Sequence, residues 1–443
     1  MDNNILLEKK LPYLFVHFVI PSIIAMVIAG AQGMVDGIFL GNFAGSDAMA
    51  SVNIANPYLQ IIIGCTMIVC TGTLSFLGRT LGENKPEKAK DIFRSSVVAL
   101  LIISLILMFA GIIFYKNIAY MLGANEVLVK GTGQYIFVIA IFAPAISFML
   151  LFGFTDRLLE KPHLYLIATV FSLMANIGMD FLAVKILKMG VRGAALATGF
   201  SYLMGLLFVI KPVLSKKSVV NVFEGKCNWN YFKDSAYNGS SEGIISLSTA
   251  VILFLFNRAF MDLAGEDGVA AFTIINYIGN FATLIMFGVS DGISSIVSCN
   301  YGAGKMERVH RTFFAAISIN FLMGVVLVFI LNLFSKNLIS VFLEGNEKIL
   351  EMAVGGAKLY ALSFLLNGFN IVQSGYHTAV GNALISVVIA ASRGIIFSTV
   401  GILILPHFLR TSGIWITPMF AETVTLILCI LIMKKKRHLY FRD

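Results

Sequence analysis

Charged residues are scarce in this chain of 443 residues: only 13% are Asp, Glu, Lys or Arg, whereas 58% are hydrophobic. The mean hydropathy is +0.86. This composition excludes a soluble globular protein, whose surface needs more polar side chains to cover it. Apolar runs of about twenty residues recur along the whole length, and a helix satisfies its own backbone hydrogen bonds in lipid. The composition therefore predicts an all-α membrane protein.

The signatures of several other protein classes are missing. The five cysteines are odd in number and scattered without a CxxC pair, which argues against a disulfide framework and a zinc site. No GxxxxGK followed by Ser or Thr occurs, so the chain itself should not hydrolyse ATP. No HExxH occurs either. We therefore expect neither an enzyme nor a protein with a bound cofactor.

The chain repeats itself. A shift of 220 positions places residues 82–88, GENKPEK, opposite residues 302–308, GAGKMER, without a gap. Further identical pairs at this spacing are Gly45 and Gly265, Asp47 and Asp267, Asn56 and Asn276, Gly72 and Gly292, and Gly193 and Gly413. Because both copies are mostly apolar, the repeat predicts two helical bundles. Such a chain is typical of a transporter that rocks one half against the other.

The apolar runs predict about twelve transmembrane helices, six in each of two parallel repeats. The spans expected are 12–40, 48–78, 92–115, 127–153, 164–186, 193–214, 238–261, 269–299, 311–335, 349–377, 383–405 and 412–433. This divides the chain into an amino-terminal lobe, 1–214, a polar linker, 215–235, and a carboxyl-terminal lobe, 236–443, with a basic tail at 434–437.

Most lysines and arginines between the spans fall on the side that also holds both termini. The positive-inside rule therefore predicts that both ends are cytoplasmic. This bias accounts for the net charge of +9 without any nucleic acid partner. The partner expected from this charge distribution is the lipid bilayer, whose headgroups the basic tail would contact.

Carboxylates inside membrane helices are costly, so each one is a candidate for function. Asp36 lies near the outer end of the first span, with Gln32 one turn earlier on the same face. Asn176 and Asp180 have the same four-residue spacing in the fifth span, and Thr198 lies in the sixth.

These candidates share a depth. Counted from the outer loops at about 1.5 Å per residue, Asp36, Asp180 and Thr198 all lie roughly 7 to 9 Å inside. Oxygen ligands in one layer suit a hard cation such as Na⁺, with Asp36, Asn176, Asp180 and Thr198 as its ligands, or a carboxylate pair that holds a proton. The alternative is that backbone groups or water satisfy each side chain separately.

These residues carry a resemblance to a known family. The pattern Gln32, Asp36, Gly41 and the segment NIGMDFLAVKILKMGVRGAALAT, residues 176–198, resemble the multidrug and toxic compound extrusion (MATE) family. The stretch GVSDGISSIVSCNYGAGK, residues 288–305, is similar to its bacterial MepA-like branch. The resemblance implies cation-coupled export of organic, often cationic and amphipathic compounds. It also implies that Asp36, Asn176, Asp180 and Thr198 line a cation site.

The carboxyl half lacks this set, because Phe256 and Val400 stand at the positions equivalent to Asp36 and Asp180. One coupling site is therefore the simpler interpretation. The second half instead carries its own polar residues within spans, namely Glu242, Asp291, Arg393 and Glu422. Glu242 and Asp291 either contact substrate or ion, or form an internal salt bridge with Arg393.

The prediction for function is a Na⁺- or H⁺-coupled antiporter for multidrug efflux, working as a monomer by alternating access. The alternative is a flippase for a lipid-linked saccharide precursor, which shares the helix arrangement but needs a basic cavity to hold pyrophosphate. A receptor or structural membrane protein is a third class, and the buried carboxylates argue against it.

Overall fold

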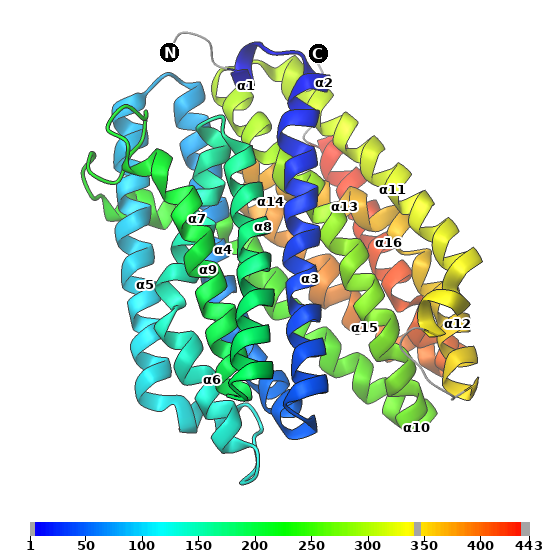
Figure 1. The fold of residues 1–443 in the computed structure, drawn as a ribbon. Helices are drawn as coiled ribbons and strands as arrows, with labels where there is room; N and C mark the ends of the chain where they lie inside the picture. Colours follow the sequence, from blue (N-terminus) through cyan, green and yellow to red (C-terminus); the bar gives the residue numbers. More distant parts are fainter. Residues whose placement is uncertain (1–4, 341–346, 436–443) are drawn as a thin grey trace. The chain divides into compact units, whose positions relative to one another are not determined.

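The computed structural model describes residues 5–340 and 347–435 (Figure 1). Lys436 and Arg437 of the predicted basic tail lie outside the described residues. The chain divides into two compact units, Met1–Gly239 and Ser240–Asp443. The described residues are helical apart from turns and short connections, so the predicted all-α fold class is confirmed.

The amino-terminal unit is a bundle of long helices that starts with three short segments. Figure 1 shows α3, α8 and α9 side by side in it, in agreement with their mutual contacts. Its elements are α1 (Ile5–Glu8), α2 (Leu11–Leu14), η1 (Phe15–Val19), α3 (Ile20–Phe43), α4 (Ser46–Gly82), α5 (Pro86–Met121), α6 (Val129–Ile141), α7 (Ala143–Leu158), α8 (Pro162–Asp180), η2 (Phe181–Ile186) and α9 (Val191–Leu214), where η marks a π-helical turn.

The rest of the chain begins with α10 (Trp229–Gly302), which starts in the amino-terminal unit and continues into the carboxyl-terminal one. The elements that follow are α11 (Met306–Ser340), α12 (Glu347–Ala361), α13 (Phe364–Ala379), α14 (Ala383–Ala391), η3 (Ser392–Ile396), α15 (Phe397–Leu409) and α16 (Thr411–Lys435).

Each of the twelve predicted spans overlaps described helix, although 127–153 and 349–377 are each divided between two helices. Within residues 5–340 and 347–435, nine helices are long and apolar enough to cross a membrane, or up to eleven if each of two bent helix pairs forms one span. The 74 residues of α10 would extend on the order of 110 Å, far more than the ~30 Å core of a bilayer. Its backbone leaves the helical conformation at Gly265, between the predicted spans 238–261 and 269–299.

The repeat in the sequence is also a repeat in backbone geometry. At the spacing of 220 residues, positive φ angles recur at Gly45 and Gly265 (88° and 64°), at Asn84 and Gly304 (57° and 69°), and at Gly190 and Arg410 (55° and 51°). The fourth span of each copy is bent, by 50° between α6 and α7 and by 49° between α12 and α13. Glycine tolerates positive φ without steric cost, which explains why it stands at four of these six positions.

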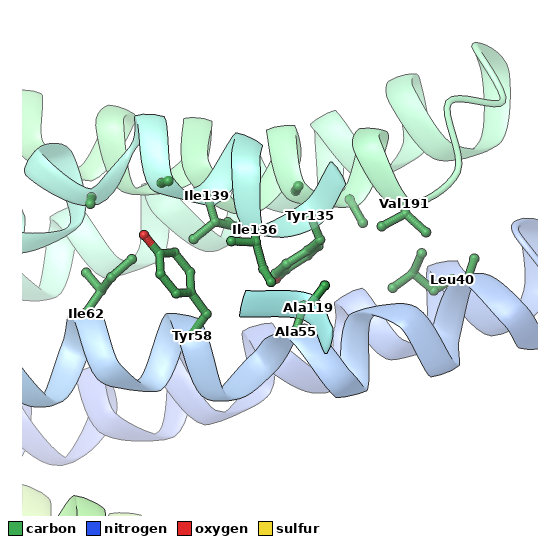
Figure 2. Close-up of a cluster of buried hydrophobic side chains, with 14 of the residues drawn as sticks. Leu40, Ala55, Tyr58, Ile62, Ala119, Tyr135, Ile136, Ile139 and Val191 are labelled. Atoms are coloured by element: carbon green, nitrogen blue, oxygen red, sulfur yellow. The ribbon is translucent and has the colours of Figure 1, made fainter. Parts of the chain in front are cut away.

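A cluster of buried apolar side chains holds the amino-terminal unit together (Figure 2). Tyr58 and Ile62 from α4 pack there with Ile136 and Ile139 from α6. The Tyr58 hydroxyl donates to the Leu107 carbonyl of α5 at 2.6 Å, so the one polar atom of that ring is satisfied. This core fixes the helices that carry the polar residues described below.

The polar linker is bound to the amino-terminal unit by several polar contacts. The Lys226 backbone N–H donates to Asp91 Oδ1 at 2.6 Å, and the Asn228 N–H donates to Ser95 Oγ at 2.8 Å. Lys90 forms an ion pair with Glu224 at 2.9 Å, and this hydrogen bond lowers the pKa of the Glu224 carboxyl. The first turns of α10 follow the linker and belong to the same unit, which ends at Gly239. The predicted boundaries of the lobes, with the first lobe ending at 214 and the second beginning at 236, remain a prediction.

The start of α10 crosses α4 at backbone contact distance. A Cβ atom on Gly72 would lie 1.8 Å from the Ser235 carbonyl oxygen, and one on Gly239 would lie 1.9 Å from the Ile68 carbonyl oxygen. Glycine permits such close approach of membrane helices. We expect Gly72→Ala to destabilise the protein by about 3 kcal/mol or more, because backbone atoms must move apart. Thermal unfolding in detergent measures this.

The matched control is Gly355→Ala in α12, where a Cβ atom would have nothing within 4 Å. Alanine favours helix over glycine by about 1 kcal/mol, so this variant should be as stable as the wild type or more so. Equal melting temperatures for the two variants would contradict the close crossing.

Candidate functional site

Three helices that pack on one another carry the predicted cation ligands. Asp36 lies on α3, Asn176 and the last residue Asp180 lie on α8, and Thr198 lies on α9. Helix α8 packs against both α3 and α9. The four-residue spacing of Asn176 and Asp180 places both on one face of α8.

The structure brings the ligands together around Asp36. Asn176 Nδ2 donates to Asp36 Oδ1 at 2.7 Å, and Thr198 Oγ1 donates to Asp36 Oδ2 at 3.0 Å. Asn176 and Asp180 are fully buried, and Thr198 is nearly so, whereas Asp36 is half-buried. The common depth predicted from the sequence therefore corresponds to contact between side chains.

Asp180 is the fourth member of the cluster, and no described residue donates a hydrogen bond to its carboxyl oxygens. Its carboxyl group interacts directly with that of Asp36. Carboxylates only accept hydrogen bonds, so two of them bond to each other only when a proton lies between them. Among the described residues, Asp180 Oδ1 and Oδ2 and Asn176 Oδ1 are buried and have no donor. Three buried oxygens with no donor, next to Asp36, suit either Na⁺ or a shared proton.

Gln32 belongs to the edge of this cluster. Its Nε2 donates to Ser201 Oγ at 2.9 Å, and that hydroxyl donates to the Thr198 carbonyl at 2.7 Å. Gln32 therefore reaches Asp36 only through Ser201 and Thr198. Ser201 was missed by sequence reasoning, although its three-residue spacing from Thr198 could have indicated it.

Tyr135 on α6 is a second residue that the sequence did not single out. It is buried in the apolar cluster (Figure 2). It also contacts Thr198 and lies within electrostatic reach of Asp36. It belongs to an apolar run that predicts only packing, so no local signal marks it. Its hydroxyl is an additional polar group at the cluster.

Helix irregularities adjoin the polar residues. Helix α8 ends at Asp180 and continues as the π-helical turn η2, and Arg393 lies inside the π-helical turn η3. π-turns are rare in proteins overall, and those that occur are often found at functional sites. Neither turn has a signal in the sequence.

Arg393 and Glu422 form the main polar contact of the carboxyl-terminal unit. Arg393 donates to Glu422 Oε1 from Nη2 at 2.9 Å and from Nε at 3.2 Å, and both side chains are about nine-tenths buried. Asn370 Nδ2 donates to Glu422 Oε2 at 2.6 Å. The salt bridge that the sequence left open for Glu242 or Asp291 is therefore formed by Glu422. Glu242 is half-buried and lies within electrostatic reach of Asp291 and Arg393.

Two further features concern other chemistries. The segment GVSDG, residues 288–292, has a GxSxG pattern, but it lies inside α10 rather than on the strand-to-helix turn that exposes a nucleophilic serine. Within the described parts of the chain, no group of three or more His, Cys, Asp or Glu side chains could hold a metal ion.

Two repeated helical units that hold carboxyl groups within their helices are typical of a membrane transporter. The MatE family model matches residues 21–182 and 243–402, one stretch in each copy of the repeat. The chain therefore belongs to the MATE family of membrane transporters and is not an enzyme.

Curated relatives match along the full length. The multidrug export protein MepA of Staphylococcus aureus (strain MRSA252) is 24% identical over 98% of this chain and 96% of its own length. MepA of Staphylococcus saprophyticus is 23% identical over 94% and 92%. The predicted likeness to the bacterial MepA branch is confirmed as distant, full-length homology.

Solved structures share the fold. An outward-facing multidrug resistance MATE transporter of the MOP superfamily has a TM-score of 0.92 and 21% identity, covering 98% of both chains. A MOP superfamily transporter from Pyrococcus furiosus, with a binding pocket of reverse polarity that suggests a different function, has a TM-score of 0.90 and 21% identity, covering 99% of this chain and 98% of its own. The fold alone is thus compatible with more than one function, and the side chains must distinguish them.

Proposed function

We propose that this chain is an antiporter that exports organic, cationic and amphipathic compounds in exchange for Na⁺ or H⁺. The observation that carries the proposal is the cluster at Asp36, where a half-buried carboxylate adjoins three buried oxygens with no donor among the described residues. Such a group is expensive in a membrane unless a positive ion neutralises it.

The coupling follows from differential binding. A cation bound by Asp36, Asp180, Asn176 and Thr198 stabilises the conformation in which these oxygens converge. It therefore shifts the equilibrium between the outward-open and inward-open states. The size of this shift is set by the difference between the cation's affinities for the two states. Release of the cation on the other side resets the cycle. Na⁺ and H⁺ both fit, because the same oxygens can coordinate the one or bind the other.

Export of drug-like compounds is supported by the relatives named as multidrug export proteins and by the composition. The chain has 37 Phe and 19 Met residues, and aromatic faces and flexible thioethers suit varied lipophilic cations. Glu242, half-buried in α10, is a carboxylate that a cationic substrate could pair with.

A flippase for lipid-linked saccharides needs free basic groups in its cavity to bind pyrophosphate. Arg393, a basic residue within a predicted span of the carboxyl half, already pairs with Glu422. This pairing favours the export of cations over that of a pyrophosphate lipid. We further propose that the protein acts as a monomer in the cytoplasmic membrane of a bacterium, with both termini cytoplasmic.

Everted membrane vesicles test the function. We expect a fluorescent lipophilic cation to accumulate in vesicles that contain the protein when a Na⁺ gradient or a pH gradient, directed out of the lumen, is imposed alone. Vesicles without the protein are the control. Transport driven by neither gradient, together with restored export of a lipid-linked saccharide in a flippase-deficient host, would favour the alternative.

A further inference from the structure

A second buried carboxylate of the amino-terminal unit has no role in the cluster at Asp36. Asp156, near the end of α7, is fully buried. Neither Oδ1 nor Oδ2 has a hydrogen-bond partner among the described residues. An unbonded carboxyl group in the protein interior costs stability and contributes no contact, so packing does not explain it.

Asp156 lies far from the cation cluster. Its backbone carbonyl accepts a hydrogen bond from the Lys161 N–H at 2.8 Å, which places it beside the start of α8. Asp180 is the last of the 19 residues of this helix. At about 1.5 Å per residue the two ends of α8 are roughly 27 Å apart. Asp156 is therefore a separate site at the opposite end of the same unit.

The charged groups at this end of the bundle are engaged elsewhere. Helices α4, α5, α6, α8 and α9 pack against α7. Arg157 lies over the rings of Phe154 and Tyr165, and Lys161 is exposed and acts on Asp156 only through space. Most of the remaining charged groups contact other partners: Arg79 with Ser75 and Phe76, Lys88 with Phe76 and Tyr231, Lys90 with Glu87 and Glu224, Asp91 with Lys226, Arg94 with Val222, and Glu160 with Leu6. His163 and Lys211 are exposed, and Lys130 of α6 lies at the far end of the unit.

Aromatic side chains lie on the same face of α7 as Asp156. Phe152, one turn before Asp156 on α7, packs against Phe93 of α5. The neighbouring Thr155 hydroxyl is occupied, because it donates to the Leu151 carbonyl at 2.8 Å. A metal ion would need several ligands, and no group of three or more His, Cys, Asp or Glu side chains within the described parts of the chain could hold one. A proton needs one oxygen and removes the charge, so it is the ligand that fits.

The equivalent turn of the second repeat also carries a buried titratable side chain. In that turn the Asn382 N–H donates to the His377 carbonyl at 2.8 Å, the same bond that Lys161 makes to Asp156. His377 is also fully buried. Both repeats thus place a group that can carry a proton at the end of their bent fourth span.

We propose that Asp156 is a second proton-binding group, separate from the coupling site, which holds a proton in the conformation described and releases it to water when this end of the unit opens. The proton remains on the carboxyl group while the environment is apolar, because an isolated charge there is far more costly than a neutral acid. When water reaches Asp156, the ionised carboxylate becomes the more stable form at neutral pH. Protonation of Asp156 is therefore linked to the conformation of this end of the bundle.

The test compares the unfolding of full-length wild type with that of Asp156→Asn, in detergent micelles at pH 6 and pH 8. The unfolded aspartate is ionised at both pH values, whereas the folded one keeps its proton, so folding takes up one proton and wild-type stability falls as pH rises. Asn carries no proton to lose. We expect the folding equilibrium constant of the wild type relative to that of the variant to fall by up to about tenfold per pH unit, or hundredfold in all.

The matched control is Asp234→Asn, which removes an exposed aspartate of the same unit and should leave the pH dependence unchanged. If Asp156→Asn does not fold, Asp156→Leu provides the same comparison. Infrared spectroscopy gives a second measurement: a protonated-carboxyl band should be present in the wild type and weaker in either Asp156 variant. Parallel pH dependences, or no difference in this band, would overturn the proposal. Neither readout involves transport, so the outcome is independent of the cation cluster at Asp36.

Discussion

Asp36→Asn should abolish ion-driven export while leaving the protein folded. The substitution keeps the size of the side chain but removes the charge that a cation or proton neutralises. Without that charge, binding of the ion no longer distinguishes the two conformations. A coupling free energy of a few kcal/mol is then lost, and we expect the rate under an imposed gradient to fall roughly a hundredfold. Uptake of a fluorescent lipophilic cation by everted vesicles measures this rate.

Retained folding is part of this prediction. Asn at position 36 can still accept a bond from Asn176 or Thr198, which hold the Asp36 oxygens at 2.7 and 3.0 Å. The melting temperature should therefore stay close to that of the wild type. Asp234→Asn, an exposed aspartate of the same unit, should transport normally. Wild-type rates for Asp36→Asn under a Na⁺ or pH gradient would remove the coupling role from this cluster.

The fold could be predicted from the sequence because lipid imposes simple rules. Apolar runs of sufficient length must be helices, and identical residues at a constant spacing must occupy equivalent places. The glycine pair Gly45 and Gly265 shows this most directly, because both adopt positive φ at the start of the second span of their copy. The bend in the fourth span of the first copy is marked by Pro144 at the start of α7, whereas the second copy bends near Leu362 with no proline beside it.

The membership of the cluster at Asp36 was predictable from the sequence, but its detailed geometry was not. Residue counts from the outer loops give the depth of Asp36, Asp180 and Thr198, and groups at one depth in one bundle have a fair chance of meeting. Depth does not give the rotation of a helix about its axis. It therefore could not show that Gln32 bonds to Ser201 rather than to Asp36, or that Tyr135 joins the cluster.

Pairing in the carboxyl-terminal unit could not be predicted for a related reason. Glu242, Asp291 and Glu422 are all acidic residues on helices of this unit, and composition does not rank them as partners for Arg393. Arg393 lies in the π-turn η3, and Asn370 donates to the remaining carboxylate oxygen of Glu422. Such selection depends on local helix geometry and on side chains from a third helix.

This ion pair leads to the second large effect that we expect. Arg393→Met should destabilise the protein by about 3 to 5 kcal/mol, because it leaves the Glu422 carboxylate buried with only the Asn370 amide to satisfy it. Chemical unfolding in detergent measures the loss. A methionine retains most of the packing volume, so the charge and not a cavity dominates the effect.

Two comparisons separate a buried charge from other causes. Arg258 pairs with Asp262, but these side chains are 70% and 55% exposed, so Arg258→Met should cost less than about 1 kcal/mol. Combining Arg393→Met with Glu422→Leu removes both charges, and the double variant should recover most of the lost stability. If it were instead less stable than Arg393→Met alone, Glu422 would contribute through bonds other than the ion pair. Equal costs for Arg393→Met and Arg258→Met would mean that water reaches the Arg393 pair, and Glu422 would then be accessible to a cationic substrate.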